Sequence, residues 1–136
     1  MSRILIVDDD PDFVEATRIV LESAGFEVSS AGDAESGLKL IADSKPDLAI
    51  LDVMLPSGYE GFEVARKARE DLGLRDLPLV MLSNVHKSKD VGYRFAPDSN
   101  YLPVDVFLDK PVTPSELVET VQKLLGERRE EPETPL

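Results

Sequence analysis

Short runs of apolar residues without polar interruption recur along the chain. They lie at residues 4–7, 48–51, 79–82 and 106–108. Because such a run leaves no polar face for solvent, we interpret each as a strand buried on both faces, as in a parallel sheet. Residues 26–30 alternate between apolar and polar positions instead, which is typical of a less buried strand near a sheet edge.

Between the strands, apolar residues recur at the spacing of three and four positions that an amphipathic helix requires. This spacing predicts helices over residues 11–24, 33–44, 62–72 and 113–126. The last helix opens with a capping box that has proline at the first helical position, Thr113-Pro114-Ser115-Glu116. Residues 84–103 are the least regular part and leave room for one short helix near 87–95, so we expect an atypical fourth helix.

The alternation of strands and helices indicates an α/β fold with a parallel sheet and helices on both faces. The chain has 136 residues and is 42% hydrophobic, which suits one domain of ordinary size. We expect this domain to cover residues 1–126. Residues 127–136 are polar, contain two prolines and lack apolar periodicity. They predict a disordered acidic tail or the start of a linker.

Composition narrows the function. The absence of cysteine excludes disulfides and thiolate metal sites. The net charge of -12 repels phosphate backbones, so we expect no direct binding of nucleic acid. Neither a signal-peptide pattern nor an apolar segment of membrane-spanning length is seen. These features predict a soluble, cytoplasmic protein without a membrane partner.

Groups capable of chemistry follow the apolar runs. Asp8 and Asp9 follow the first strand, Asp52 ends the central strand, Ser83 follows the next, and Lys110 comes just after the last. In open α/β sheets, sites form outside the carboxyl ends of the strands where the strand order reverses. We therefore expect these side chains to converge around Asp52.

Three converging carboxylates repel one another, and a hard divalent cation relieves the repulsion. With a lysine and a hydroxyl nearby, such a set can hold a phosphoryl group, and an aspartate can be its nucleophile. Each residue also has a simpler interpretation. A strand-end aspartate commonly caps a turn, Asp8 to Asp10 could favour the positive end of the following helix, and Lys110 and Ser83 could be ordinary surface residues. Chance explains the whole set much less readily.

The same stretches resemble the receiver domain of two-component response regulators, the family of the bacterial chemotaxis regulator. The matching pieces, in the family's order, are Ile4-Leu5-Ile6-Val7-Asp8-Asp9-Asp10, Leu51-Asp52-Val53-Met54-Leu55-Pro56, Met81-Leu82-Ser83 and Lys110-Pro111. The resemblance covers residues 3–126. It implies a flavodoxin-like, three-layer fold whose five-stranded parallel sheet has the order 2-1-3-4-5.

The resemblance also implies roles. Asp52 would accept the phosphoryl group, Asp9 would bind Mg²⁺ directly, Asp8 would help through water, and the Met54 backbone carbonyl would complete the protein ligands. A Walker loop and a dinucleotide fingerprint are both absent, so Mg²⁺ is the one cofactor we expect.

Two further residues and a switch follow from the resemblance. Ser83 and Lys110 would contact the phosphoryl group. Phe107 would be the aromatic residue that moves inward as Ser83 is drawn to the phosphate; without the resemblance, Phe107 is an ordinary core aromatic. Met54 and Val85 occupy positions that influence loss of the phosphoryl group, and since both are apolar we expect slow self-dephosphorylation.

The implied partners are a histidine kinase or phosphotransfer protein as donor, and a downstream protein that the sequence does not identify. The chain would not be an enzyme beyond its own phosphorylation and dephosphorylation, and would be a monomer or a phosphorylation-dependent dimer. It could be a stand-alone receiver or part of a longer regulator. The alternatives are a docking module that works without phosphorylation and a metal-dependent phosphohydrolase, for which no water-activating residue is evident.

Overall fold

The computed structural model describes residues 2–52, 60–83, 105–109 and 112–133. Its centre is a five-stranded sheet in the order β2-β1-β3-β4-β5, and every pair of neighbouring strands is parallel. The strands are β1 (Arg3–Val7), β2 (Glu27–Ala31), β3 (Leu48–Asp52), β4 (Leu79–Ser83) and β5 (Val106–Asp109). The predicted fold class and strand order are therefore confirmed.

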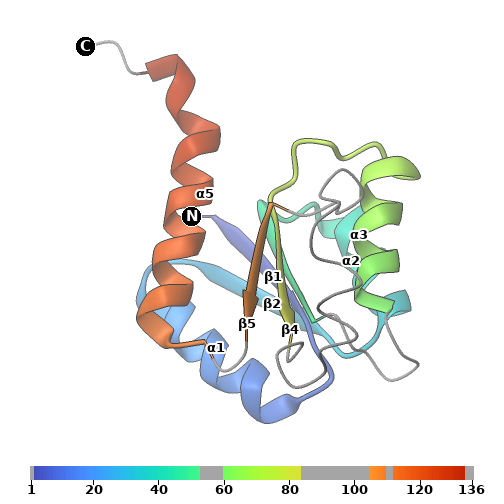
Figure 1. Cartoon of the computed structure of the whole chain (residues 1–136), viewed down its shortest axis with the longest axis horizontal. Coiled ribbons are helices and arrows are strands. Elements are labelled where there is room, and N and C mark those ends of the chain that lie inside the picture. Colours follow the sequence, from blue (N-terminus) through green and yellow to red (C-terminus); the bar gives the residue numbers. More distant parts are fainter. Residues whose placement is uncertain (1, 53–59, 84–104, 110–111, 134–136) are drawn as a thin grey trace.

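Helices cover both faces of the sheet and give three layers (Figure 1). The described helices are α1 (Pro11–Ser23), α2 (Ala34–Ser44), α3 (Glu60–Glu70) and α5 (Pro114–Glu133). Helices α1 and α5 lie on one face, and α2 and α3 on the other. The helix expected near residues 87–95 lies outside the described residues. Across the described parts of the chain, no helix is both long and apolar enough to cross a membrane.

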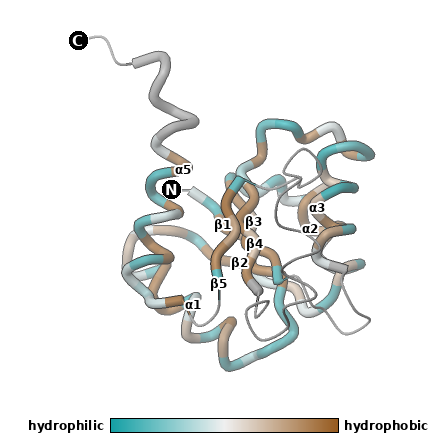
Figure 2. The backbone as a smooth tube through the Cα atoms, viewed as in Figure 1, coloured by the Kyte–Doolittle hydropathy of each residue, from teal (hydrophilic) through white to brown (hydrophobic). Residues whose placement is uncertain are grey.

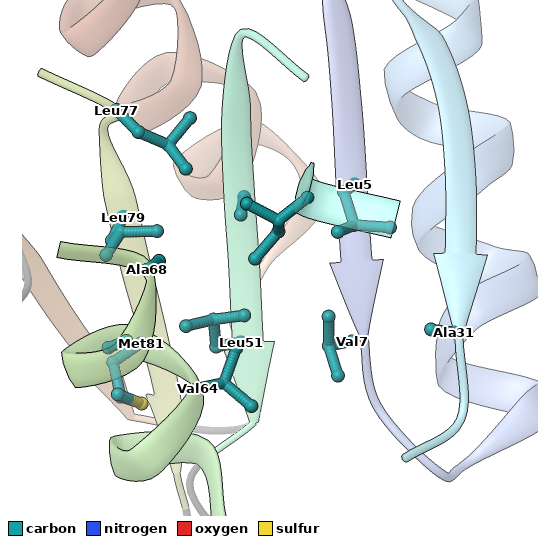
Figure 3. Close-up of a cluster of buried hydrophobic side chains, with 12 residues drawn as sticks. Leu5, Val7, Ala31, Leu51, Val64, Ala68, Leu77, Leu79 and Met81 are labelled. Atoms are coloured by element: carbon teal, nitrogen blue, oxygen red, sulfur yellow. The ribbon is translucent and has the colours of Figure 1, made fainter. Parts of the chain in front are cut away.

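The core explains why the strand sequences are apolar without interruption. Successive residues of a strand point to opposite faces, and both faces are covered here. Leu5 and Val7 of β1 pack toward α2 and α3, whereas Ile4 and Ile6 pack toward α1 and α5. Figure 2 shows the strands as a hydrophobic centre, and Figure 3 shows side chains of β1, β3 and β4, Leu51 among them, gathered beside α3.

Side-chain caps start α1 and α5 where the sequence predicts. The carboxylate of Asp10 accepts hydrogen bonds from the backbone N–H groups of Asp12 (3.0 Å) and Phe13 (3.3 Å) at the start of α1. The Thr113 hydroxyl accepts from the Glu116 N–H at 3.1 Å, which is the first half of the predicted capping box. These bonds satisfy N–H groups that have no partner within their own helix.

The predicted end of the last helix is wrong. We placed it at Gly126, but α5 continues to Glu133. A glycine inside a helix costs only about 1 kcal/mol relative to alanine, and residues 127–131 are all Glu or Arg, which are strong helix formers. Because extending an existing helix is far easier than starting one, the helix passes through the glycine. The division between domain and tail at residue 126 stays a prediction.

Helix α2 approaches the sheet closely at Gly37. This glycine is buried, and a methyl group added there would lie 2.9 Å from Val7 Cγ2 and 3.0 Å from Val7 Cγ1. Gly126 is also helical, but a methyl group there would meet nothing within 4 Å. Alanine substitutions at the two glycines therefore distinguish the cost of close packing from the gain in helix propensity.

We expect Gly37→Ala to lower the free energy of unfolding by about 1–2 kcal/mol, because overpacking against Val7 outweighs the gain in helix propensity. Gly126→Ala, the matched control, should leave stability unchanged or raise it by up to about 1 kcal/mol. Urea unfolding followed by circular dichroism measures both. Equal stability of the two variants would show that α2 can move away from β1 without loss.

Candidate functional site

Strand register brings two carboxylates together at one edge of the sheet. Val7, the last residue of β1, pairs with Leu51 of β3, so the next residues, Asp8 and Asp52, lie opposite each other. Asp8 is 3% exposed and Asp52 is 8% exposed, whereas Asp9 faces solvent. One carboxylate oxygen from each of the three lies within 4.8 Å of the others. The predicted convergence of these residues is confirmed.

The three aspartates of the turn after β1 have two different roles. The Asp8 N–H donates to the Ala31 carbonyl at 3.0 Å, which extends the pairing of β1 with β2 by one residue. The Asp8 carboxylate accepts from the Asp10 N–H at 2.9 Å, and the Asp10 carboxylate caps α1. The simple capping interpretation therefore holds for Asp10, while Asp8 and Asp9 join Asp52 in the acidic cluster.

The acidic cluster, defined as Asp8, Asp9 and Asp52, has the chemistry of a site for a hard cation. Oxygen ligands suit Mg²⁺ and Ca²⁺, and Mg²⁺ commonly binds one or two carboxylates while keeping several waters. Two of the carboxylates are buried, where negative charge is poorly solvated and a cation is most stabilising. The positive amino end of α1 follows directly, which also favours negative charge here. The three side chains can therefore hold a metal ion.

Of the other predicted site residues, the structure describes only some. Ser83 ends β4, one residue beyond the Leu82 that pairs with Asp52, and its own pairing partner is Asp109 of β5. The backbone of Ser83 thus lies at the same sheet edge as the acidic cluster. Lys110 follows Asp109 directly in the sequence, but Lys110 and Met54 lie outside the described residues. Their predicted roles stay predictions.

Phe107 lies in β5 on the face covered by α2 and α3. It is partly buried, and its ring centroid is 6.3 Å from that of Phe62 in α3, with 41° between the ring planes. In this structure Phe107 is a core aromatic, and its proposed movement stays a prediction. Sequence reasoning did not single out Phe62, because no local pattern shows which aromatic residue of α3 will meet β5.

The family model for the response regulator receiver domain matches residues 4–122. The chain is 38% identical over 131 residues to the DNA-binding response regulator MtrA of Mycolicibacterium smegmatis, covering 96% of this chain and 54% of that protein. It is 36% identical over 130 residues to the phosphate regulon transcriptional regulatory protein PhoB of Pseudomonas aeruginosa, covering 91% and 52%. The chain therefore spans about half the length of these relatives.

Solved structures of response regulators are also similar to this chain. A CheY-like receiver domain protein from Methanospirillum hungatei is 30% identical, with a TM-score of 0.80 over 94% of this chain and 96% of that one. The response regulator TrrA of Thermotoga maritima, crystallised in complex with Mg²⁺-BeF, is 31% identical, with a TM-score of 0.73 over 91% and 99%.

The fold and the acidic cluster define a phosphoacceptor type of signalling domain rather than an enzyme in the usual sense. The chain belongs to the response regulator receiver domain family of two-component signalling.

Removing one charge from the acidic cluster tests whether it binds a cation. In metal-free buffer of low ionic strength, we expect Asp9→Asn to raise the free energy of unfolding by about 1 kcal/mol, because it removes one of three mutually repelling charges. In Mg²⁺ the order should reverse, since bound cation stabilises the folded wild type more than the variant. Thermal unfolding with and without Mg²⁺ measures both effects.

Asp76→Asn is the matched control, because Asp76 is exposed and lies outside the acidic cluster. Its effect on stability should be the same with and without Mg²⁺. If Mg²⁺ stabilised Asp9→Asn as much as the wild type, Asp9 would not be a ligand.

Proposed function

We propose that this domain takes a phosphoryl group onto Asp52, with Mg²⁺ held in the acidic cluster, and that the modification switches its contacts with other proteins. The observation that carries this proposal is the cluster itself: Asp8, Asp9 and Asp52 lie within 4.8 Å at the carboxyl edge of the sheet. The Mg²⁺-BeF complex of the similar TrrA protein supports the same type of site.

The three carboxylates are not equivalent, and their surroundings favour Asp52 as the nucleophile. Asp8 accepts a hydrogen bond from the Asp10 N–H, which orients its carboxylate in the turn. Asp9 faces solvent. Asp52 ends the buried strand β3, next to β4, whose last residue is Ser83. A fixed position on a buried strand suits a group that must meet phosphorus in line.

The chemical step is the transfer of a phosphoryl group from a donor to the Asp52 carboxylate. A carboxylate oxygen of Asp52 forms a bond to phosphorus, while the bond from phosphorus to the donor breaks and its electron pair leaves with the donor. The donor is a phosphohistidine imidazole or, in a test tube, an acyl phosphate. Asp9, Asp52 and the Met54 carbonyl would hold Mg²⁺, with Asp8 helping through water, and the ion would supply positive charge beside the phosphoryl oxygens. The Ser83 hydroxyl and the Lys110 ammonium would bind oxygens of the transferred group.

We further propose a histidine kinase or phosphotransfer protein as the donor, and a downstream protein that distinguishes the phosphorylated from the unphosphorylated form. Both encounters would occur in the cytoplasm, with the domain as a monomer or as a dimer that forms on phosphorylation. The net charge of -12 argues against contact between this domain and nucleic acid. MtrA is named as DNA-binding, and that property is not carried over to this domain.

Intact mass after incubation with acetyl phosphate tests the acceptor. We expect one phosphoryl adduct on the wild type in Mg²⁺ and none in EDTA. Asp52→Asn should form no adduct. Lys110→Ala should react at least about tenfold more slowly, because the positive charge that binds the phosphoryl oxygens is lost. Asp76→Asn should match the wild type. An adduct of equal yield on Asp52→Asn would refute the assignment, and no adduct on the folded wild type would favour a phosphorylation-independent docking module.

The adduct should also be long-lived, because apolar Met54 and Val85 cannot orient an attacking water. We expect a polar residue at either position, in Met54→Asn or Val85→Asn, to shorten its half-life. The measurement is the decay of the adduct by mass after the donor is removed. Rapid decay in the wild type that neither substitution alters would contradict this expectation.

A further inference from the structure

Strand β5 matters for two of the predicted functions, because it contains Phe107 and precedes Lys110. Among the described strands it pairs only with β4, as β2 at the other side of the sheet pairs only with β1. The residues of β5 are partly buried or exposed, whereas every residue of β3 is buried. Phe107 lies within β5, and Lys110 follows its last residue. The register of β5 on β4 therefore sets the position of Phe107 and of Asp109, the residue that Lys110 follows.

Asp105, the residue before β5, forms a double link with the start of β4. Its N–H donates to the Leu79 carbonyl at 2.8 Å, and its carboxylate accepts from the Leu79 N–H at 2.8 Å. Both hydrogen-bonding groups of Leu79 are thereby tied to a single residue. A shift of β5 along β4 would break both bonds, so this link is specific for the register.

Arg69 in the last turn of α3 holds the Asp105 carboxylate in place. Its Nη2 donates to the same Asp105 oxygen at 3.1 Å. Its Nη1 lies 3.1 Å from the Leu74 carbonyl oxygen, 2.9 Å from that of Arg75 and 2.6 Å from that of Leu77. The Arg69 side chain is only 16% exposed. One guanidinium thus joins the end of α3, the connection to β4 and the start of β5.

We infer that Arg69 and Asp105 are positioning residues that fix the register of β5 and thereby place Lys110 for the reaction at Asp52. They lie at the amino end of the sheet, opposite the acidic cluster, so they act through the strand and not by contact with the phosphoryl group. The inference rests on the proposed function, in which Lys110 binds the transferred group.

The geometry of a strand explains why register matters here. A slip of one residue turns every side chain of a strand to the opposite face. Phe107 would then leave Phe62 and α3, and the end of β5, from which the chain continues to Lys110, would shift by about 3.3 Å. A displacement of that size at a group that binds the transferred phosphoryl is enough to slow the reaction by one or two orders of magnitude.

Arg66 provides a matched control on the same helix. It forms ion pairs with Glu63 at 2.6 Å and with Glu70 at 3.3 Å, and its side chain is 45% exposed. These partners all belong to α3, so they do not reach β4 or β5. Arg66→Met and Arg69→Met remove the same group from one helix, but only the second variant breaks the link to β5.

The experiment measures two properties of each full-length variant at a temperature where circular dichroism shows it folded. These are the initial rate of phosphorylation by acetyl phosphate at saturating Mg²⁺, and the affinity for Mg²⁺ by calorimetry. We expect Arg69→Met and Asp105→Ala to slow phosphorylation by at least about tenfold. The dissociation constant for Mg²⁺ should stay within about twofold of the wild type, because the acidic cluster lies at the carboxyl ends of β1 and β3. Arg66→Met should match the wild type in both.

Amide hydrogen exchange supplies a readout that does not depend on phosphorylation. In Asp105→Ala, the amides of β5 should exchange faster while those of β1 and β3 keep their protection. Asp105→Asn retains an acceptor for the Leu79 N–H but loses the charge beside Arg69, so it should fall between the wild type and Asp105→Ala. It serves as the working variant where Asp105→Ala does not fold.

Several results would overturn the inference. Phosphorylation of Arg69→Met and Asp105→Ala at the wild-type rate would show that β5 needs no such anchor. A fall in Mg²⁺ affinity parallel to the fall in rate would show a general loss of structure instead of a positioning role. If the wild type itself formed no adduct, the proposed function would fail, and unchanged exchange of the β5 amides would separately refute the register claim.

Discussion

The pairing of β1 with β3 is the constraint on which the site depends. The register places Val7 opposite Leu51. The next residue of each strand is an aspartate, so Asp8 and Asp52 lie together at one edge of the sheet. Their carboxylates are buried and close, an arrangement that is unfavourable by itself. The strands behind them are covered by helices on both faces, and this apolar burial offsets the repulsion. Because a bound cation would relieve the repulsion, the same three side chains are able to hold a metal ion.

Parts of this structure could be predicted because they depend on local sequence or on topology alone. Uninterrupted apolar runs identify buried parallel strands, and the carboxyl ends of parallel strands necessarily meet at one edge, which is why Asp8, Asp9 and Asp52 could be grouped. The end of α5 could not be predicted in the same way. Glycine often ends a helix, but α5 continues past Gly126 because the residues that follow favour a helix.

Contacts between distant elements were not predictable from local patterns. The Arg3 guanidinium at the start of β1 donates to the carbonyls of Ser44 and, at 3.1 Å, Lys45 at the end of α2, although α2 has no basic residue in its own last turn. From the sequence, Arg3 is simply a polar residue before a strand. The same holds for Gly37, which fits no turn or helix stop and is explained only by the closeness of Val7. Such residues become meaningful once helices are placed on the sheet.

The charged groups at the two edges of the sheet, where the strands begin and where they end, are arranged in opposite ways. At the amino edge, opposite charges and helix-end carbonyls are paired: Arg3 with the end of α2, and Arg69 with Asp105 and the connection before β4. At the carboxyl edge, like charges are gathered. Paired groups resist displacement, whereas gathered like charges respond strongly to any added charge. A parallel sheet directs all its strands from the first edge to the second, so the paired groups lie near the starts of the strands and the acidic cluster lies at the carboxyl ends of β1 and β3. A cation at the carboxyl edge would therefore act on the acidic cluster, while the paired groups lie at the opposite ends of β1, β4 and β5.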